Sequence, residues 1–355
     1  MPSPIADLEL RHLLAQISDR EGLESHLQQS GRSLYCGFDP TAPSLHIGNL
    51  VPLLTLRRFQ LAGHCPIALV GGATGLIGDP SERVDERGLN DVDVVRGWGE
   101  RLSQQVSRFI DLDGKYAARV VDNLEWTSPL DALGFLRNIG KLFSVNAMIQ
   151  RDSVKNRLGR EGEGISYTEF SYMLLQAYDF LELSRRYQCT IQVGGSDQWG
   201  NMVSGIDLIR RVDGQQAFVL TVPLITRSDG LKFGKTADGA IWLDPDMTSP
   251  YRFYQFWLNS ADEDVVPFLG YFTFLDSSDI ADAATELRDR PGERGAQRLL
   301  AREVTLLAHG QGALSSAERI TAALFGGAVA DLKREDLEQL RLDGMDSTSV
   351  ENEEE

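Results

Sequence analysis

Three short apolar runs in this chain each end in a turn rich in glycine or proline, and each turn leads into a helical pattern. The runs, which we predict to be strands, are Arg32–Phe38, Pro66–Val70 and Thr190–Val193. Further strands are predicted at Ala118–Asp122 and Phe218–Thr221, again with helical patterns between them. Because parallel strands need long crossover connections, this alternation favours a parallel sheet with crossover helices. We therefore predict an α/β fold with a ligand site at the carboxyl ends of the strands.

The pattern changes after about Pro245, where helical segments continue without strand signals. They cover Tyr251–Leu258, Ala281–Arg288 and Gly295–His309. A single core stops growing near ~250–300 residues, so a chain of 355 residues is expected to hold two domains. We predict a sheet domain over 1–245, a smaller α-helical domain over 246–335 and an acidic polar tail over 336–355.

Composition argues against several classes of protein. The formal net charge of −17 does not suit a protein that coats nucleic acid through a broadly basic surface. The cysteines Cys36, Cys65 and Cys189 form no C-x-x-C pair, which argues against disulfides and a structural zinc site. No apolar run approaches the ~18 residues of a membrane helix, and the first residues lack the order of a signal peptide. A cytoplasmic location is therefore expected.

A basic island interrupts this acidic chain between Arg137 and Arg160. Its positive residues are Arg137, Lys141, Arg151, Lys155, Arg157 and Arg160, against Asp152 alone. Such a patch can bind phosphate groups, but it can equally be the solvated face of a helix. The sequence leaves both interpretations open.

The first segment with a chemical signal runs from a strand end through a proline-rich turn into a helix start at His46. A helix start offers free N–H groups and a positive dipole end, which suit a phosphate. His46 and Asn49 are three residues apart and would face one ligand, while Gly48 permits a close approach. A histidine with a structural partner is the alternative.

Two glycine-rich turns and one lysine-bearing loop follow along the chain. Gly71–Pro80 contains the carboxylate of Asp79, and Gly194–Asn201 contains that of Asp197, which can accept hydrogen bonds from sugar hydroxyls. Tight structural turns would have the same composition. Lys232–Thr236 carries two lysines three apart, an arrangement that suits a polyphosphate but is more often a surface feature.

A long helix is predicted to begin with a capping box at Ser166 and Glu169. Along it, Tyr172, Gln176 and Asp179 fall at i, i+4 and i+7 and form one polar stripe on an otherwise apolar helix. If the stripe is buried it needs partners, since an unmatched buried polar group costs ~1–3 kcal/mol. A small polar ligand would supply them, and a stripe that faces water is the alternative.

Together and in this order, these segments resemble the class I aminoacyl-tRNA synthetases, and the bacterial tyrosine-specific branch in particular. His46-Ile47-Gly48-Asn49 resembles the signature H-I-G-H, and Lys232-Phe233-Gly234-Lys235-Thr236 resembles K-M-S-K-S. Tyr35–Thr41, the polar stripe and Gly194–Asn201 make the match specific, and it spans roughly Leu34 to Leu258. The resemblance implies a Rossmann-like catalytic domain over 1–245, followed by a helical domain for the anticodon region of a tRNA.

The resemblance also implies a role for each site residue. Tyr35 and Asp179 would hydrogen-bond the phenol of a tyrosine substrate, and Gln198 would lie near its carboxylate. Its ammonium group would be received by Asp79, Tyr172 and Gln176. The residues expected to bind ATP are Cys36, Gly37, Asp39, His46, Gly48, Asn49, Gly195, Asp197 and Lys235. Those expected to act on its phosphates during the reaction are Thr41, His46, Lys232, Lys235, Thr236, Arg83 and Arg87.

The implied reaction begins when the carboxylate of L-tyrosine attacks the α-phosphate of ATP. The products are tyrosyl-adenylate and pyrophosphate, and the tyrosyl group then passes to the terminal adenosine of tRNA(Tyr). Magnesium would accompany ATP, held by phosphates and water, and no tightly bound protein metal site is expected. The resemblance further implies a homodimer, with a contact region around residues 130–165.

Two other functions compete with this one. A synthetase for tryptophan would share the signatures, but an indole needs only one acceptor, whereas Tyr35 and Asp179 form a pair. A non-catalytic RNA-binding or scaffold protein would also keep the fold. The retained His46, Lys232 and Lys235 argue against that function.

Transfer to tRNA depends on positive charge, which is scarce here. Bacterial members of the family usually continue into a small basic RNA-binding domain, whereas this sequence ends in acidic residues. We therefore expect normal formation of tyrosyl-adenylate but poor charging of tRNA, with a deficit that grows as salt rises. Exchange and aminoacylation would be measured on one preparation, beside a version extended by a basic domain. Equal charging by both would contradict the expectation.

Overall fold

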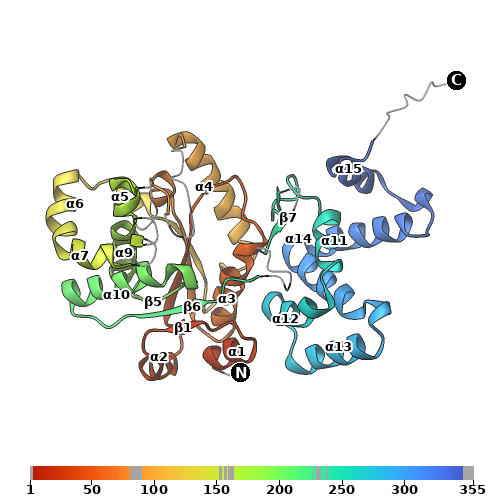
Figure 1. Cartoon of the computed structure of the whole chain (residues 1–355), viewed down its shortest axis with the longest axis horizontal. Coiled ribbons are helices and arrows are strands. Elements are labelled where there is room, and N and C mark those ends of the chain that lie inside the picture. Colours follow the sequence, from red (N-terminus) through yellow and green to blue (C-terminus); the bar gives the residue numbers. More distant parts are fainter. Residues whose placement is uncertain are drawn as a thin grey trace. The chain divides into compact units, whose positions relative to one another are not determined.

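The computed structural model describes residues 3–79, 81, 90–151, 154–155, 158, 164–226, 228, 233–236 and 239–346, without the side chains of Lys235 and Thr236. The chain forms two compact units (Figure 1). The first comprises residues 1–44 and 49–225, and the second comprises residues 45–48 and 226–355. The division therefore falls near residue 225 instead of 245, and part of the first signature belongs to the second unit. In the described part of the chain, no helix is long and apolar enough to cross a membrane.

The first unit is built on a six-stranded sheet in the order β1-β6-β5-β2-β3-β4. The strands are β1 (Gln16–Ile17), β2 (Ser33–Phe38), β3 (Cys65–Val70), β4 (Arg119–Asp122), β5 (Cys189–Gly195) and β6 (Phe218–Val222). Neighbours from β6 to β4 pair in parallel, and β1 pairs antiparallel to β6. The predicted α/β sheet and its five predicted strands are confirmed. Strand β1 was not predicted, because two residues carry no periodicity.

Strand order reverses between β2 and β5, which are adjacent although the sequence separates them by most of the unit. The chain proceeds outward from β2 to β3 and β4 on one side, and from β5 to β6 on the other. In open α/β sheets, the carboxyl ends of the strands at such a reversal are the usual ligand site.

Helices cover both faces of this sheet (Figure 1). Helices α3 (Leu50–Leu61) and α4 (Val92–Val106) pack against β3, whereas α9 (Tyr167–Tyr187) and α10 (Trp199–Asp213) pack against β5. The other helices of this unit are α1 (Pro4–Leu10), α2 (Arg20–Leu27), α5 (Leu124–Thr127), α6 (Ala132–Asn138) and α7 (Val145–Ile149). Its short 3-10 turns include η2 (Thr74–Leu76) and η4 (Ser196–Gln198). Helices lie on both faces of the sheet, and β6 is buried along its whole length.

Helix α9 begins as its sequence predicts. The side chain of Ser166 caps it and accepts a hydrogen bond from the backbone N–H of Glu169 at 3.2 Å. Two members of its polar stripe, Tyr172 and Asp179, are buried. The stripe therefore does not face water, and its partners must come from the interior of the unit or from a ligand.

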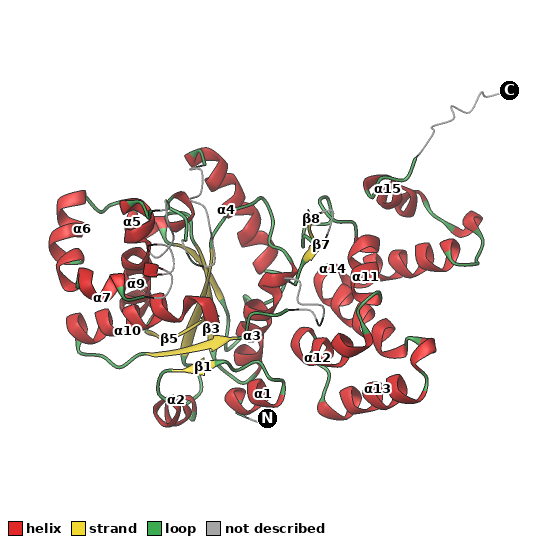
Figure 2. Cartoon of the chain, in the orientation of Figure 1, coloured by secondary structure: helices red, strands yellow, loops and turns green. Residues whose placement is uncertain are grey.

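In its described residues, the second unit consists mainly of helices, with a hairpin of two short strands (Figure 2). It contains β7 (Lys235–Thr236), β8 (Gly239–Ala240), α11 (Pro250–Leu258), α12 (Asp262–Phe272), α13 (Ser277–Asp289), α14 (Gly295–Leu324) and α15 (Arg334–Leu342). The predicted helices at Tyr251, Ala281 and Gly295 are confirmed. Gly310 interrupts α14 with φ 80° and ψ 175°, a conformation that only glycine adopts without strain.

Helix α15 extends past residue 336, where the polar tail was expected to begin. Asp336 is fully buried and accepts hydrogen bonds from Arg319 on α14, with Nε at 2.9 Å. Arg319 and Ser316, which also contacts Asp336, lie 17 and 20 residues upstream. The local sequence around Asp336 predicted a charged tail, because the residues that bury and bond Asp336 are distant in sequence.

Candidate functional site

The predicted site residues are divided between the two units. Those in the first unit are Tyr35, Cys36, Gly37, Asp39, Thr41, Asn49, Asp79, Tyr172, Gln176, Asp179, Gly195, Asp197 and Gln198. Those in the second are His46, Gly48, Lys235 and Thr236. Arg83, Arg87 and Lys232 lie outside the described residues, as do the side chains of Lys235 and Thr236.

A buried carboxylate and a buried phenol lie at the centre of the first unit. Asp179 is 2 % exposed and accepts hydrogen bonds from Asn123 Nδ2 at 3.0 Å and Trp126 Nε1 at 2.8 Å. Tyr35 is 1 % exposed, and its hydroxyl has no hydrogen-bond partner among the described residues. A buried hydroxyl without a partner is costly, so a polar ligand atom at this point would stabilise the site.

Burial governs the protonation of this pair. Removal from water raises the pKa of Asp179 to about 7, against the opposing effect of its hydrogen bonds from Asn123 and Trp126. Burial also raises the pKa of Tyr35 well above its ordinary value, and the nearby Asp179 raises it further. The Tyr35 hydroxyl therefore keeps its proton, and Asp179 lies within its electrostatic reach.

A chain of hydrogen bonds joins Asp179 to Tyr172, which lies two turns earlier on α9. The Tyr172 hydroxyl donates to Asp39 Oδ2, and Thr74 Oγ1 donates to Asp39 Oδ1, each at 2.7 Å. Asn123 Nδ2, which donates to Asp179, also donates to Thr74 Oγ1 at 3.1 Å. The two ends of the polar stripe are thus held by one connected network.

Glycine is required where this network touches the turn after β3. A Cβ at Gly71 would lie 1.9 Å from Asp39 Oδ1, and one at Gly72 would lie 2.5 Å from Asp122 Oδ1. Both distances are shorter than real Cβ contacts, so any other residue would displace a carboxylate. The glycine-rich turn therefore lets β3 end directly against the carboxylates that follow β2 and β4.

A second polar group lies at the carboxyl end of β5. Gln198 Nε2 donates to Asp79 Oδ2 at 2.6 Å and to Asp197 Oδ2 at 2.7 Å. The side chain of Gln198 thus joins two carboxylates that come from different loops. On α9, Gln176 adds a buried carbonyl oxygen without a hydrogen-bond partner among the described residues.

Both signature segments meet one short stretch of chain in the second unit. The N–H of Ile47 donates to the carbonyl oxygen of Ile241 at 3.0 Å, and the N–H of Ile241 donates to that of Gly234 at 3.2 Å. His46 forms a bridge to Trp242. Ile241 therefore connects the first signature to the second by backbone hydrogen bonds.

The imidazole of His46 is oriented by its own turn. The backbone N–H of Gly48 donates to His46 Nδ1 at 3.0 Å, so the neutral ring carries its proton on Nε2. A Cβ at Gly48 would lie 2.7 Å from His46 Cε1, which explains why glycine follows two positions later. The arrangement presents an N–H donor of the kind that suits a phosphate oxygen.

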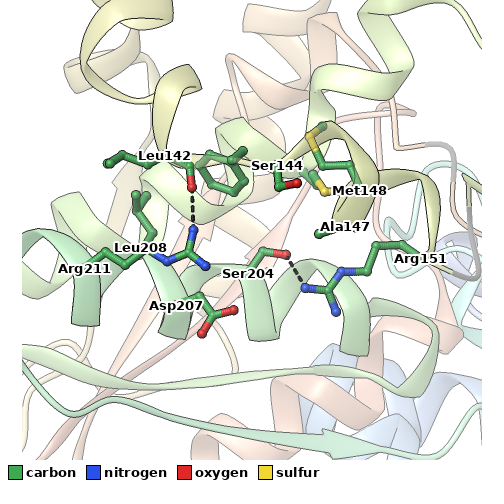
Figure 3. A pocket seen from close by; sticks show the side chains of 11 residues that line it. Leu142, Ser144, Ala147, Met148, Arg151, Ser204, Asp207, Leu208 and Arg211 are labelled. Atoms are coloured by element: carbon green, nitrogen blue, oxygen red, sulfur yellow. Dashed lines mark hydrogen bonds between the residues drawn. The ribbon is translucent and has the colours of Figure 1, made fainter.

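A groove outside this network opens between α7 and α10. Its apolar lining includes Leu142, Phe143, Ala147, Met148, Met173 and Leu208. Figure 3 shows Arg151 donating to Ser204 Oγ, at 3.2 Å, and Arg211 donating to the carbonyl oxygen of Leu142. The lining residues from Leu142 to Arg151 fall within the region for which a dimer contact and a basic island were predicted, whereas those on α9 and α10 lie outside it.

The sequence analysis missed three residues of the network, Thr74, Asn123 and Trp126. Each acts on a predicted residue through a side-chain hydrogen bond, Thr74 on Asp39 and the other two on Asp179. Asn123 directly follows β4, so its place at a strand end was the one available signal. Among the described residues, no group of three or more acidic, histidine or cysteine side chains could hold a metal ion.

The amino-acid sequence is similar to those of known tRNA synthetases. The model of the family "tRNA synthetases class I (W and Y)" matches residues 28–326. A tyrosine–tRNA ligase of Aliivibrio salmonicida is 56% identical over 348 residues, which are 98% of this chain and 82% of that protein. One of Dechloromonas aromatica is 56% identical over 347 residues, with the same two shares.

Solved structures of tyrosyl-tRNA synthetases are similar to the structure of this chain. A C-terminally truncated mitochondrial tyrosyl-tRNA synthetase of Aspergillus nidulans has a TM-score of 0.83 at 30% identity, and covers 92% of this chain and 95% of its own. A tyrosyl-tRNA synthetase of Archaeoglobus fulgidus, complexed with L-tyrosine, has a TM-score of 0.64 at 15% identity and covers 88% of this chain and 99% of its own. At that identity the second likeness concerns the fold alone.

The raised pKa of Asp179 predicts a pH-dependent stability. Its folded pKa of about 7 exceeds the ~3.9 of an unfolded chain, so the folded state holds this proton more tightly. Relative to Asp179→Asn, the wild type should therefore lose stability as pH rises from about 4 through about 7. Denaturant unfolding of both proteins across this range measures the difference.

Asp213 supplies the matched control, because Arg185 lowers the pKa of this partly exposed carboxyl. Its contribution to stability is complete above the unfolded pKa of ~3.9 and is lost as pH falls from about 5. The difference between wild type and Asp213→Asn should accordingly stay constant from pH ~5 to ~7. A constant difference for Asp179→Asn as well would contradict the assignment.

Proposed function

This chain belongs to the class I tRNA synthetases of the tryptophan and tyrosine family, and we propose that it is a ligase that joins L-tyrosine to tRNA(Tyr) at the expense of ATP. The observation that carries the choice of tyrosine is the buried pair of Tyr35 and Asp179. A phenol has one O–H to donate and lone pairs to accept with, and this pair offers one donor and one acceptor. The names of the similar bacterial proteins support the same substrate.

The rest of the tyrosine site follows the polar stripe of α9. The substrate ammonium would lie near the oxygens of Tyr172, Gln176 and Asp79. The Gln176 carbonyl oxygen is buried without a partner among the described residues, and Asp79 already has a neighbour in Gln198. Gln198 carries a donor that can turn to the substrate carboxylate. Asp179 and Asp79 would thus bind opposite ends of one amino acid.

ATP would bind beside the tyrosine site, along strand ends and the first signature. The proposed contacts to its adenosine and phosphates are Cys36, Gly37, Asp39, Thr41, His46, Gly48, Asn49, Gly195 and Asp197. A Cβ at Gly195 would lie 2.4 Å from Asp197 Oδ1, so a larger residue there would displace the Asp197 carboxylate. Burial raises the pKa of the Cys36 thiol to about 12, so it can serve as a donor but not as a nucleophile at neutral pH.

The chemistry needs position and charge stabilisation from the protein. The carboxylate of tyrosine attacks the α-phosphate, the bond to the β-phosphate breaks, and pyrophosphate leaves with the added negative charge. His46 Nε2–H and the lysines and threonine of the second signature, Lys232, Lys235 and Thr236, would stabilise that charge, together with Arg83 and Arg87. ATP would enter as its magnesium complex, which the phosphates and water hold. The adenylate then gives its tyrosyl group to a ribose hydroxyl at the 3' end of the tRNA.

Two surfaces of the first unit suit the larger partners. Helices α6 and α7 expose apolar side chains that a monomer would not be expected to leave in water, among them Leu133 at 79% and Val145 at 57%. We propose that this face, within residues 130–165, joins two copies of the chain.

The basic island from Arg137 to Arg160 would contact tRNA phosphates. The reaction would take place in the cytoplasm, where tRNA is used.

Replacement of the phenol acceptor tests the proposed substrate. Asp179→Ala should reduce the preference for tyrosine over phenylalanine by about 10- to 100-fold, the equivalent of one hydrogen bond to a charged group. Pyrophosphate exchange with each amino acid gives the two values of kcat/KM. Unchanged selectivity in a folded variant would remove Asp179 from the pocket and with it the argument for tyrosine.

A second variant tests the proposed role of the second signature. Lys235→Ala should slow formation of tyrosyl-adenylate by about 100-fold and leave tyrosine affinity unchanged, because the lysine meets charge that develops only during the reaction. Stopped-flow kinetics separate the two quantities. Lys115→Ala, at an exposed position of the first unit, is the control and should change neither. A loss of tyrosine affinity without a loss of rate would make Lys235 a ground-state ligand.

A further inference from the structure

Helix α12 of the second unit contacts the chain at two points near the second signature, one at Ser228, four residues before it, and one at Phe233 within it. The first contact is made by Asp264, in the first turn of the helix, which is buried. Its Oδ1 accepts a hydrogen bond from the backbone N–H of Ser228 at 3.0 Å, and its Oδ2 accepts one from the Ser228 hydroxyl at 3.2 Å. Both carboxylate oxygens are thus committed to one serine that precedes the signature. Charge-assisted bonds of this kind are stronger than neutral ones, and two of them fix direction as well as distance.

The second point of attachment is Phe233, the second residue of the signature, which is only 8 % exposed. Its ring stacks on Phe272 of α12, with centroids 5.0 Å apart and planes at 16°. It meets Phe268, one turn earlier on the same helix, edge-on at 5.1 Å. Phe256 and Trp257 of α11 complete the enclosure at 5.8 and 5.6 Å. A signature residue between two lysines in sequence is therefore anchored in an aromatic core.

Gly234 connects the anchored Phe233 to the first signature. It has φ +83°, and a Cβ there would lie 3.0 Å from Ile47 Cγ1. Its carbonyl oxygen accepts from Ile241, whose own carbonyl oxygen accepts from Ile47. Strand β7 starts at the next residue, Lys235. The position of Phe233 therefore sets where Lys235 leaves the core and how close the two signatures run.

We propose that Phe233 and Asp264 are positioning residues for adenylate formation, with α12 as the support that holds the second signature beside the first. The proposal rests on the proposed function and adds to it a part of the protein that touches no substrate. The Phe233 ring packs into the aromatic core and Asp264 bonds Ser228, so both residues would act on the rate through the position of the second signature. Because a displacement of about 1 Å can cost about 10²-fold in rate, loss of either attachment should reduce the rate of the chemical step.

Phe233→Ala is the direct test, and Phe253→Ala is its matched control. Both phenylalanines are buried in the same helical unit and both contact Trp257. Phe233 also contacts Phe268 and Phe272 of α12, whereas the other ring contact of Phe253 is with His309 of α14. We expect Phe233→Ala to slow formation of tyrosyl-adenylate in single-turnover kinetics by about 10- to 100-fold, with tyrosine affinity unchanged. Phe253→Ala should lower the unfolding temperature but keep the rate.

Two further variants separate positioning from general damage. Phe233→Met keeps an adaptable apolar side chain that packs well against aromatic rings, so it should recover most of the rate. Asp264→Ala should slow the chemical step, whereas Glu263→Ala, an exposed acidic residue in the same turn, should not. If Phe233→Ala does not fold, Asp264→Ala against Glu263→Ala decides the question by the same measurement.

The outcomes distinguish this inference from the proposed function. A wild-type protein that forms no adenylate with tyrosine would contradict the proposed function itself. Adenylate formation by the wild type, with equal rates for Phe233→Ala and Phe253→Ala, would overturn the inference alone. It would likewise be overturned if Asp264→Ala weakened tyrosine binding in proportion to the rate, because a positioning residue of the second signature should spare the tyrosine site in the first unit.

Discussion

The burial of the Asp179 carboxylate is the constraint on which the first unit depends. A carboxylate removed from water needs donors, and here they come from Asn123 and Trp126, which follow β4. To bring them to α9, the sheet must place the ends of β2, β3 and β4 side by side, and the turn after β3 must be glycine at Gly71 and Gly72. The network that results leaves the Tyr35 hydroxyl as a buried donor without a protein partner among the described residues. The proposed specificity for a phenol would therefore follow from the way in which Asp179 is buried.

The second unit meets a different requirement, which is to hold the two signature segments together. It does so with backbone hydrogen bonds through Ile241 and with an aromatic core around Phe233. Leu45–Gly48 belongs to the second unit and takes part in these backbone hydrogen bonds through Ile47. In the proposed function, the amino acid would therefore be bound by a buried polar network, and the segments that act on the phosphates would be held by an apolar core.

Sequence reasoning recovered what local patterns encode. The five parallel strands and the cap at Ser166 depend on residues within a few positions of one another. The sequence left open whether the stripe with Tyr172 and Asp179 faces water, because its burial depends on distant parts of the chain. Asn123 and Trp126 were missed because hydrogen bonds to a residue 53 or 56 positions away leave no periodicity. The same reason explains α15, where Asp336 depends on Arg319. The departure of Leu45–Gly48 into the second unit could not be predicted from a helix-start pattern.

The most direct test of the account is ATP–pyrophosphate exchange with each of the twenty amino acids in turn. If the Tyr35 hydroxyl and the Asp179 carboxylate receive the side chain of the substrate, tyrosine should support exchange and phenylalanine and tryptophan should not. Phenylalanine lacks the hydroxyl. Tryptophan has a single N–H donor, whereas the pair of Tyr35 and Asp179 offers one donor and one acceptor. Exchange with tryptophan in preference to tyrosine, or equal exchange with tyrosine and phenylalanine, would contradict the account.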